Sequence, residues 1–312
     1  MQKPTFPFWE RRGSYMRVYD EIQDFCLKNT AVTLGKFDGI HLGHQKLVTE
    51  IAESRLRDGY ETVLFSFDTS GINNQMSITT KKERILLCEE AGIDNVIFYP
   101  VNKSTMAIKA EDFIKDVIAD RLGAKVVVTG RDFCFGSERR GNVGMLNSYA
   151  EIYGYRLVVV DSVLYQGKKV SSSNIKECIG QGKIEEANRM LGYSYFIYGN
   201  VVKGNQIGRT MNTKTVNVIP DKQKILMPNG VYKTKAVIGG ETYKSITNVG
   251  LCPTVRSDRK ITVETHIFDF DREIYDSDVK IEFEKFIREE RKFSTLEELK
   301  RQILLDISQA NL

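Results

Sequence analysis

The sequence predicts a two-domain α/β protein, with a doubly wound parallel sheet followed by a small antiparallel β-barrel and a C-terminal helix. From Thr30 to Asp161, short apolar runs alternate with segments of helical periodicity, which indicates a parallel sheet covered on both faces. After about residue 194, several strand-like segments follow one another closely, which is typical of a small barrel. The length of 312 residues suits two domains.

The elements of the first domain follow from apolar runs and helical spacing. In the first expected helix, Leu47, Val48, Ile51 and Ala52 recur at helical spacing. Thr80 and Glu83 are placed as a capping box for the second. Strands are expected at TAVTLGKF (30–37), ETVLFSF (61–67), NVIFYPV (95–101), AKVVVTG (124–130) and YRLVVVD (155–161), and helices at 44–59, 79–92, 110–123 and near 143–153.

The second domain is expected to begin after the short helix IEEANRMLG (184–192), and turns are expected at Gly239–Gly240 and Asp271–Arg272. A last helix, residues 294–308, would have Ser294 as its cap. The predicted division is 16–188 and 189–312. Residues 1–15 are interpreted as a leader or tag, because MQKPTFPFWERRGS fits no element downstream. Strands are expected within 195–204, 230–240, 243–250, 261–270 and 279–287.

Composition excludes some classes of protein. The net charge is +4 without a long basic tract, which argues against a nucleic-acid groove but suits small polyanions such as nucleotides. The five cysteines are scattered and form no CxxC pair, so we expect reduced thiols in a cytoplasmic protein. No apolar run reaches the ~20 residues that cross a bilayer, and no membrane partner is expected. An oligomer is compatible with the sequence.

The stretch GKFDGIHLGHQ (35–45) holds two of the three histidines of the chain, His41 and His44, among three glycines. It lies where the first strand passes into the first helix, and ligands of open α/β sheets bind at the carboxyl ends of strands. Free N–H groups at the helix start attract phosphate, and glycines let the backbone approach it. The stretch could instead be a plain turn, or a metal chelate. The paired histidines favour phosphate binding, and no cluster of further metal ligands is evident.

GKFDGIHLGH resembles the GxFDGxHxGH signature of the nucleotidyltransferase superfamily. VVVTGRDFCFGSERRG (126–141) and VSSSNIKECIGQGKIEEANRMLG (170–192) are similar to two further motifs of the bacterial bifunctional riboflavin kinase/FAD synthetases, and the resemblance spans residues 16–312. It implies that the first domain is an FMN adenylyltransferase with catalytic His41, His44 and Lys176. It also implies nucleotide contacts from Gly35, Phe37, Asp38, Gly39, Ser171, Ser172 and Ser173, and flavin contacts from Asp132, Phe133 and Phe135.

GNVVKGNQIGRT (199–210) resembles the kinase glycine loop of the same family, which implies nucleotide binding by Gly204, Gly208 and Arg209. NTKTVN (212–217) is similar to the GxPTxN motif, whose counterparts here, Thr215 and Asn217, would bind Mg²⁺. Within TVETHIF (262–268), Glu264, Thr262 and His266 share one face of a strand, and Val263 and Thr265 share the other. The resemblance makes Glu264 the catalytic base, and Arg291 in RKF a flavin contact.

The implied activity is ATP-dependent phosphorylation of riboflavin to FMN, then adenylylation of FMN to FAD with release of pyrophosphate. The chain departs from the family pattern at Lys176, which replaces an arginine, at Asn212 and Lys214, and at FSFDTSGINN (65–74), which lacks a His-Pro pair. Two alternatives therefore stay open. One is a monofunctional FMN adenylyltransferase with a degenerate kinase module, and the other is a non-catalytic flavin-binding regulator.

Overall fold

The computed structural model of the chain describes residues 15–21, 25–70, 72, 76–202, 215–252, 260–270, 272, 274, 277–291 and some residues between 295 and 308. Contacts divide the chain into two compact units. The first unit is Met1–Gln75 with Lys81–Ser172, and the second is Met76–Thr80 with Ser173–Leu312. The domain boundary expected between residues 188 and 189 stays a prediction.

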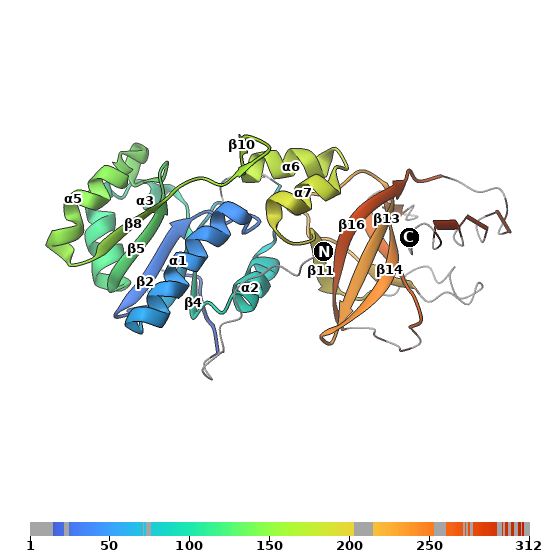
Figure 1. The fold of residues 1–312 in the computed structure, drawn as a ribbon, viewed down its shortest axis with the longest axis horizontal. Coiled ribbons are helices and arrows are strands. Elements are labelled where there is room, and N and C mark those ends of the chain that lie inside the picture. Colours follow the sequence, from blue (N-terminus) through green and yellow to red (C-terminus); the bar gives the residue numbers. More distant parts are fainter. Residues whose placement is uncertain are drawn as a thin grey trace. The chain divides into compact units, whose positions relative to one another are not determined.

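The first unit is built on a six-stranded, all-parallel sheet (Figure 1). Its order, β1-β4-β3-β2-β5-β8, reverses direction between β2 and β5, which is the doubly wound arrangement that the sequence predicts. The central strands are buried on both faces: Val32, Leu34, Val63 and Phe65 are at most 1 % exposed. The strands are β1 (Arg17–Tyr19), β2 (Thr30–Gly35), β3 (Glu61–Asp68), β4 (Asn95–Pro100), β5 (Ala124–Gly130) and β8 (Arg156–Val160).

Helices cover this sheet. The long helix α1 (Leu42–Asp58) packs on the sheet, against β2, β3 and β5 (Figure 1). Its residues Leu47, Val48 and Ile51 are buried, as their spacing predicts. The helix expected over 110–123 is a short α-helical turn that continues as a π-helix, closed by the bond from Leu122 N–H to Val117 O. The other elements are α2 (Lys81–Glu90), α3 (Lys103–Met106), α4 (Ala110–Asp112), the π-helix η2 (Phe113–Arg121), the 3₁₀ turn η3 (Ser137–Arg139) and α5 (Val143–Tyr153).

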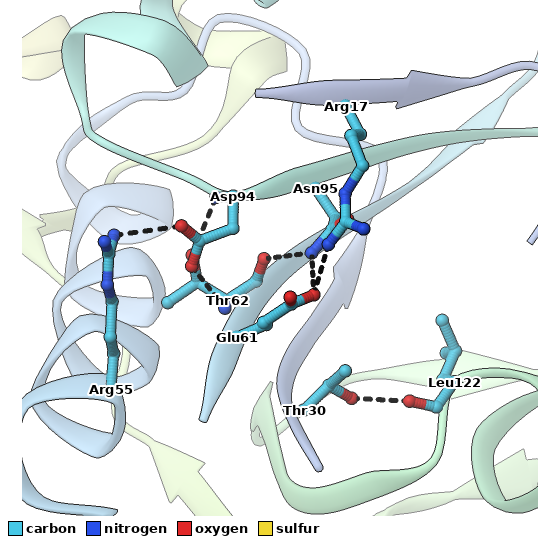
Figure 2. A network of polar contacts seen from close by, with 8 residues as sticks. All are labelled: Arg17, Thr30, Arg55, Glu61, Thr62, Asp94, Asn95 and Leu122. Carbon is cyan, nitrogen blue, oxygen red and sulfur yellow. Dashed lines mark hydrogen bonds and ion pairs between the residues drawn. The ribbon is translucent and has the colours of Figure 1, made fainter. Parts of the chain in front are cut away.

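A polar network ties the amino ends of β3 and β4 to α1 (Figure 2). Asp94 accepts bonds from the backbone N–H and the hydroxyl of Thr62, both at 2.9 Å, and forms an ion pair of 3.2 Å with Arg55 of α1. Asn95 donates to Glu61 at 3.1 Å, and Arg17 pairs with the same carboxylate. Because Arg55 lies in the last turn of α1, this network holds the C-terminal end of that helix.

Two short hairpins follow β5 in sequence. β6 (Cys134–Phe135) pairs with β7 (Gly141–Asn142), and β9 (Leu164–Tyr165) pairs with β10 (Lys168–Lys169). Neither hairpin is evident from the sequence, because two-residue strands carry no periodicity. No helix in the described part of the chain is long and apolar enough to cross a membrane.

The second unit contains a curled antiparallel sheet of order β11-β16-β13-β14-β15-β12. A bridge between Val202, just beyond β11, and Asn217 of β12 joins the two edges of this sheet, which closes it toward a barrel. The expected turn at Gly239–Gly240 is present, with positive φ at both residues. The elements are α6 (Ser172–Gly180), α7 (Ile184–Leu191), β11 (Phe196–Asn200), β12 (Thr215–Val218), β13 (Gly230–Ile238), β14 (Glu241–Cys252), β15 (Lys260–Ile267) and β16 (Asp278–Arg288).

The segment Met76–Thr80, which follows β3 in sequence, is part of the second unit. Ser77 pairs with Lys224 as a parallel bridge, and the Lys224 ammonium donates to the carbonyl of Ile78 at 2.6 Å. Lys224 is only 2 % exposed, and its ammonium lies 4.4 Å from the centre of the Tyr195 ring. The sequence gives no sign of this excursion.

The expected strands and helices of both units are confirmed where the structure describes them. β1 and β12 are further strands that the sequence analysis does not predict. The closing helix lies partly outside the described residues, which are helical at 297–298, 301–302, 305–306 and 308. Ser294 and Asp271 are also outside them. Four cysteines, Cys26, Cys88, Cys134 and Cys178, are free thiols, as predicted.

Candidate active sites

The loop from Gly35 to His41 links β2 to α1 through an unusual backbone. Phe37 and Ile40 have positive φ values of 51° and 34°, and Gly39 has a φ of 88°. Positive φ is costly for residues with a side chain, so the surroundings must hold this loop in place. Phe37 and Ile40 are at most 1 % exposed, and their buried side chains provide that anchorage. The loop therefore presents its other residues in a fixed geometry.

His41 and His44 form a stacked pair at the start of α1. Their ring centroids are 3.8 Å apart, with 17° between the planes, and the ring of Phe37 lies 5.0 Å from that of His44. Gly43 makes room for this arrangement, because a Cβ there would lie 3.2 Å from Cε1 of His41. His41 is the N-cap residue of α1, and its side chain makes no capping bond. The glycines of the motif thus leave space for the stacked histidine rings and also allow the backbone conformation of the loop.

Burial favours the neutral form of both imidazoles. Burial lowers the pKa of His41 to about 4, against the opposing effect of Asp38. Burial, the neighbouring His41 and the charge of Arg84 lower the pKa of His44 well below its usual value. The Nδ1 atoms of both rings are buried and have no hydrogen-bond partner among the described residues. A bound phosphate would meet two neutral rings that it could draw toward protonation.

The serine motif meets the histidine loop inside the first unit. The Ser172 hydroxyl donates to the carbonyl of Asp38 at 2.8 Å, although the two residues are 134 positions apart. Ser171 and Ser172 line the same cavity as Gly35, His41 and His44. Ser172 is therefore held against the loop that carries the histidines, which supports the interpretation that the two motifs share a ligand.

That cavity has a volume of about 830 Å³ and lies entirely in the first unit. It opens at the carboxyl ends of β2 and β5, at the point where the strand order reverses. One part is lined by the histidine loop and the serines. The other is lined by side chains that are largely aromatic. The aromatic lining residues are Phe67, Tyr99, Phe113, Phe133 and Phe135.

The aromatic wall is one packed cluster. The rings of Phe133 and Phe135 are stacked at 5.5 Å, and Phe113 lies 5.5 Å from Phe135 and 6.0 Å from Phe67. Gly141 fits under this wall, since a Cβ there would lie 2.7 Å from two ring carbons of Phe135. The wall offers flat apolar surfaces of the kind on which a planar ring system stacks.

Asp132 also lines the cavity and forms an ion pair with Lys169 of β10. The hydrogen bond from Lys169 lowers the pKa of the Asp132 carboxyl. Lys169 and Lys36, which both line the cavity, carry positive charge near the histidines. Sequence reasoning did not single out these lysines, nor Phe67, Tyr99 and Phe113. A signal for Phe67 and Tyr99 was available, because each is the next-to-last residue of its strand, β3 or β4, at the same edge of the sheet.

A second constellation lies on β12 and β15 of the second unit. Val216, Val218, Val263 and Thr265 are buried, whereas the residues that alternate with them are half-buried, as strand geometry predicts. Asn217 lies directly opposite Glu264 in the register of the two strands. The Thr215 hydroxyl donates to Oε1 of Glu264 at 3.0 Å. A hydroxyl, an amide and a carboxylate are therefore brought together on one face.

Glu264 also lies opposite Asn248 of β14, and the Asn248 amide donates to Glu290 at 3.2 Å. Arg291 follows as an exposed residue. Gly204, Gly208, Arg209, Asn212 and Lys214 lie outside the described residues, and their roles stay predictions. Ser173 and Lys176 belong to the part of α6 that counts with the second unit, so their predicted part in adenylylation also stays a prediction.

In the part of the chain that the structure describes, no group of three or more His, Cys, Asp or Glu side chains could hold a metal ion.

Comparison with known families gives two matches in tandem. Residues 24–174 match the family model described as FAD synthetase, and residues 191–312 match the one described as riboflavin kinase. The first range contains the histidine loop, the aromatic wall and Ser171 to Ser173. The second contains Thr215, Asn217 and Glu264.

Curated relatives match over most of the chain. A bifunctional riboflavin kinase/FMN adenylyltransferase from Buchnera aphidicola (strain Sg) is 35 % identical over 288 residues, 89 % of this chain and 92 % of that protein. An Escherichia coli (strain K12) protein of the same name is 28 % identical, covering 88 % of this chain and 90 % of its own length. A crystal structure titled macrolide-efflux protein, from Streptococcus pneumoniae, has the same fold, with a TM-score of 0.83 and 25 % identity over 95 % of this chain and 99 % of that one.

Proposed function

The chain belongs to the family of bifunctional riboflavin kinase/FMN adenylyltransferases, and we propose that each of its two units holds one of the two reactions. The second unit phosphorylates riboflavin with ATP to give FMN. The first unit transfers AMP from a second ATP to FMN, which gives FAD and pyrophosphate. The relatives are named for both activities, so the two alternatives, a monofunctional adenylyltransferase and a non-catalytic regulator, are set aside.

One observation supports the adenylyltransferase assignment most directly. A single cavity of about 830 Å³ joins the His41–His44 pair to the aromatic wall. This volume lies within the ~300–1,000 Å³ of typical small-molecule sites. The aromatic wall suits the planar flavin ring, and the histidine loop at the start of α1 suits a triphosphate. Gly35, Phe37, Asp38 and Gly39 shape the loop at the phosphate end.

In the proposed first-unit reaction, a phosphate oxygen of FMN attacks the α-phosphorus of ATP. The bond from that phosphorus to the bridging oxygen of the β-phosphate breaks, and pyrophosphate leaves. His41 and His44 donate hydrogen bonds to the phosphates on which negative charge grows, a role that preorganised donors perform without covalent chemistry. Ser171 and Ser172 hold the nucleotide against the loop, with Ser173 and Lys176 assigned to the same task by the family motif. Phe133 and Phe135 stack on the flavin, and Asp132 contacts its polar part.

In the proposed second-unit reaction, the terminal hydroxyl of the riboflavin ribityl chain attacks the γ-phosphorus of ATP, and ADP leaves. Glu264 accepts the hydroxyl proton, which is the task of a general base. Thr215 already holds the carboxylate of Glu264 by a hydrogen bond of 3.0 Å. Gly204, Gly208 and Arg209 would cradle the phosphates, and Arg291 would contact the flavin.

The oxygen donors of Thr215 and Asn217 suit a hard cation, and the adjacent Glu264 carboxylate adds negative charge. These residues therefore fit Mg²⁺, and Thr215 and Asn217 would hold it. The ion neutralises phosphate charge when it is bound. The four free thiols among the described residues support a reducing, cytoplasmic location.

A two-substrate assay tests the assignment of one reaction to each unit. Riboflavin or FMN is incubated with ATP and Mg²⁺, and FMN and FAD are separated by chromatography. His44→Ala should lower FAD formation from FMN by about 10²–10³-fold and leave riboflavin phosphorylation intact. Equal loss of both activities in a folded variant would contradict the two-site assignment.

Glu264→Gln should give the complementary result. Glutamine keeps the shape of the side chain but cannot accept the hydroxyl proton, so FMN formation should fall by about 10²–10⁴-fold. Conversion of supplied FMN to FAD should persist. An unchanged kinase rate would show that Glu264 is an ordinary strand residue.

A further inference from the structure

Arg84 is a buried cation behind the histidine loop. It lies on α2 and is 9 % exposed, with its guanidinium 5.7 Å from the centre of the Phe98 ring. Among the residues that the structure describes, no carboxylate forms an ion pair with it, and its Nε has no hydrogen-bond partner. A buried charge without a counter-charge is costly, so its retention calls for an explanation.

The bonds of Arg84 point to the loop. Its Nη1 donates to Oγ of Ser66 at 2.8 Å and to the carbonyl of Lys36 at 3.3 Å. Ser66 itself donates to the same carbonyl at 3.0 Å. Lys36 is the first residue after β2, and Ser66 lies near the end of β3, so these three groups clamp two neighbouring strands where they approach the cavity.

The clamp acts immediately before the strained part of the loop. Phe37, with its φ of 51°, follows the clamped carbonyl directly, and its ring lies 5.0 Å from that of His44. A strained conformation persists only where the surroundings over-determine it. Fixing the carbonyl of Lys36 fixes the peptide that enters Phe37, and through Phe37 the position of the histidine ring.

We propose that Arg84 is a positioning residue for adenylyl transfer, which clamps the histidine loop through the Lys36 carbonyl and places behind His44 a positive charge that no described carboxylate pairs. The proposal rests on the assignment of adenylylation to the first unit. The phosphates of the bound nucleotide would be the missing negative partner of this charge, acting across the loop. Arg84 does not line the cavity and would not touch substrate.

The electrostatic part of the proposal has a definite sign. His44 is faced by His41, by Arg84 and by the uncharged ring of Phe37, whereas Asp38 and Lys169 act on His41. Burial is the largest cause of the lowered pKa of His44, and the charges of His41 and Arg84 lower it further. Removing the charge of Arg84 should therefore raise the pKa of His44.

The test compares Arg84→Met, Arg84→Lys and Ser66→Ala, with Lys82→Met, an exposed site on the same helix, as the matched control. Arg84→Met should lower kcat for FMN adenylylation by about 10²-fold, because small displacements of catalytic groups have effects of that size. Arg84→Lys keeps the charge and a donor and should recover most of the rate. Ser66→Ala should lower kcat by a few-fold without moving the pKa of His44. Riboflavin phosphorylation should be unchanged in all four variants.

The decisive readout is the pKa of His44, followed by NMR in the full chain. It should rise in Arg84→Met and stay close to the wild-type value in Arg84→Lys. An unmoved pKa in a folded Arg84→Met protein, or equal losses of kcat in the methionine and lysine variants, would overturn the proposal. If Arg84→Met does not fold, the lysine and alanine variants still test the proposal. Full adenylylation activity in Ser66→Ala would contradict the clamping role. Failure of the wild-type chain to convert FMN to FAD would instead refute the proposed function, and the His44 titration would still report on Arg84.

Discussion

Acidification should destabilise the first unit through His41. This side chain is 6 % exposed, and its pKa in the folded protein is about 4, against 6.5 for the unperturbed group. Between these two values the unfolded chain binds more protons than the folded one. The free energy of unfolding therefore falls as the pH falls from 6.5 toward 4, and this effect vanishes at higher pH.

The size of the effect follows from the two pKa values. For a single group that moves from 6.5 to about 4, the loss is about 2 kcal/mol at about pH 5 and about 3 kcal/mol at about pH 4. That is a large part of the ~5–15 kcal/mol that stabilises a typical domain. Neutral glutamine at this position has no such pH dependence. His41→Gln also relieves the repulsion on His44, which changes the pH dependence in the same direction.

Two measurements check this. The chain has only three histidines, so the ring-proton signals of each can be followed separately in an NMR titration. Single His→Gln variants assign each signal to its residue. Hydrogen exchange at the amides of β2 then reports the stability of the first unit alone. The stability of His41→Gln relative to wild type should increase by about 2 kcal/mol between about pH 7 and about pH 5. A His41 pKa near 6.5, or a difference that does not vary with pH, would refute the reasoning.

Two further variants test the walls of the cavity. Gly141→Ala should raise KM for FMN by about tenfold, because the added Cβ would lie 2.7 Å from ring carbons of Phe135 and overpacking typically costs ~1–3 kcal/mol. Gly180→Ala, where a Cβ meets nothing within 4 Å, is the control, and equal KM values would contradict this account. Ser172→Ala should lower kcat/KM for ATP in adenylylation by about fivefold, since it removes the 2.8 Å bond to Asp38 and a typical hydrogen bond contributes ~1 kcal/mol. Unchanged ATP kinetics would show that the serine only caps its helix.

Local patterns in the sequence predict much of this fold and part of the site. The placement of His41 and His44 at a strand-to-helix turn follows from apolar periodicity that switches at a glycine-rich stretch. The alternating burial around Glu264 follows from strand geometry and is confirmed at Val263 and Thr265. Such predictions succeed because each depends on residues close together in the chain.

Features that depend on tertiary contacts escape this reasoning. From its charge alone, Arg84 would be expected on the exposed face of its helix. It lies instead on the buried face with Leu87 and Cys88, which follow it by three and four residues. That spacing is a signal in principle, but only the pairing of β2 with β3 brings Ser66 and Lys36 to it. The π-helix from Phe113 to Arg121 has no sequence signature, because its buried residues, Phe113, Ile114, Val117 and Ile118, have a spacing that an α-helix would also give.

Because Met76–Thr80 belongs to the second unit, the chain is not a simple fusion of two domains, and this limits how it can be divided into fragments. Two finished domains fused end to end would be joined by a single crossing, but this chain crosses between its units at residues 75–76, 80–81 and 172–173. A fragment that begins at Ser173 would lack Ile78, whose carbonyl accepts a bond from the buried ammonium of Lys224. Losing a hydrogen bond of a charged group typically costs ~1.5–3 kcal/mol. Dissection into independent modules therefore requires complementation, with the pentapeptide supplied to the second fragment as a separate piece.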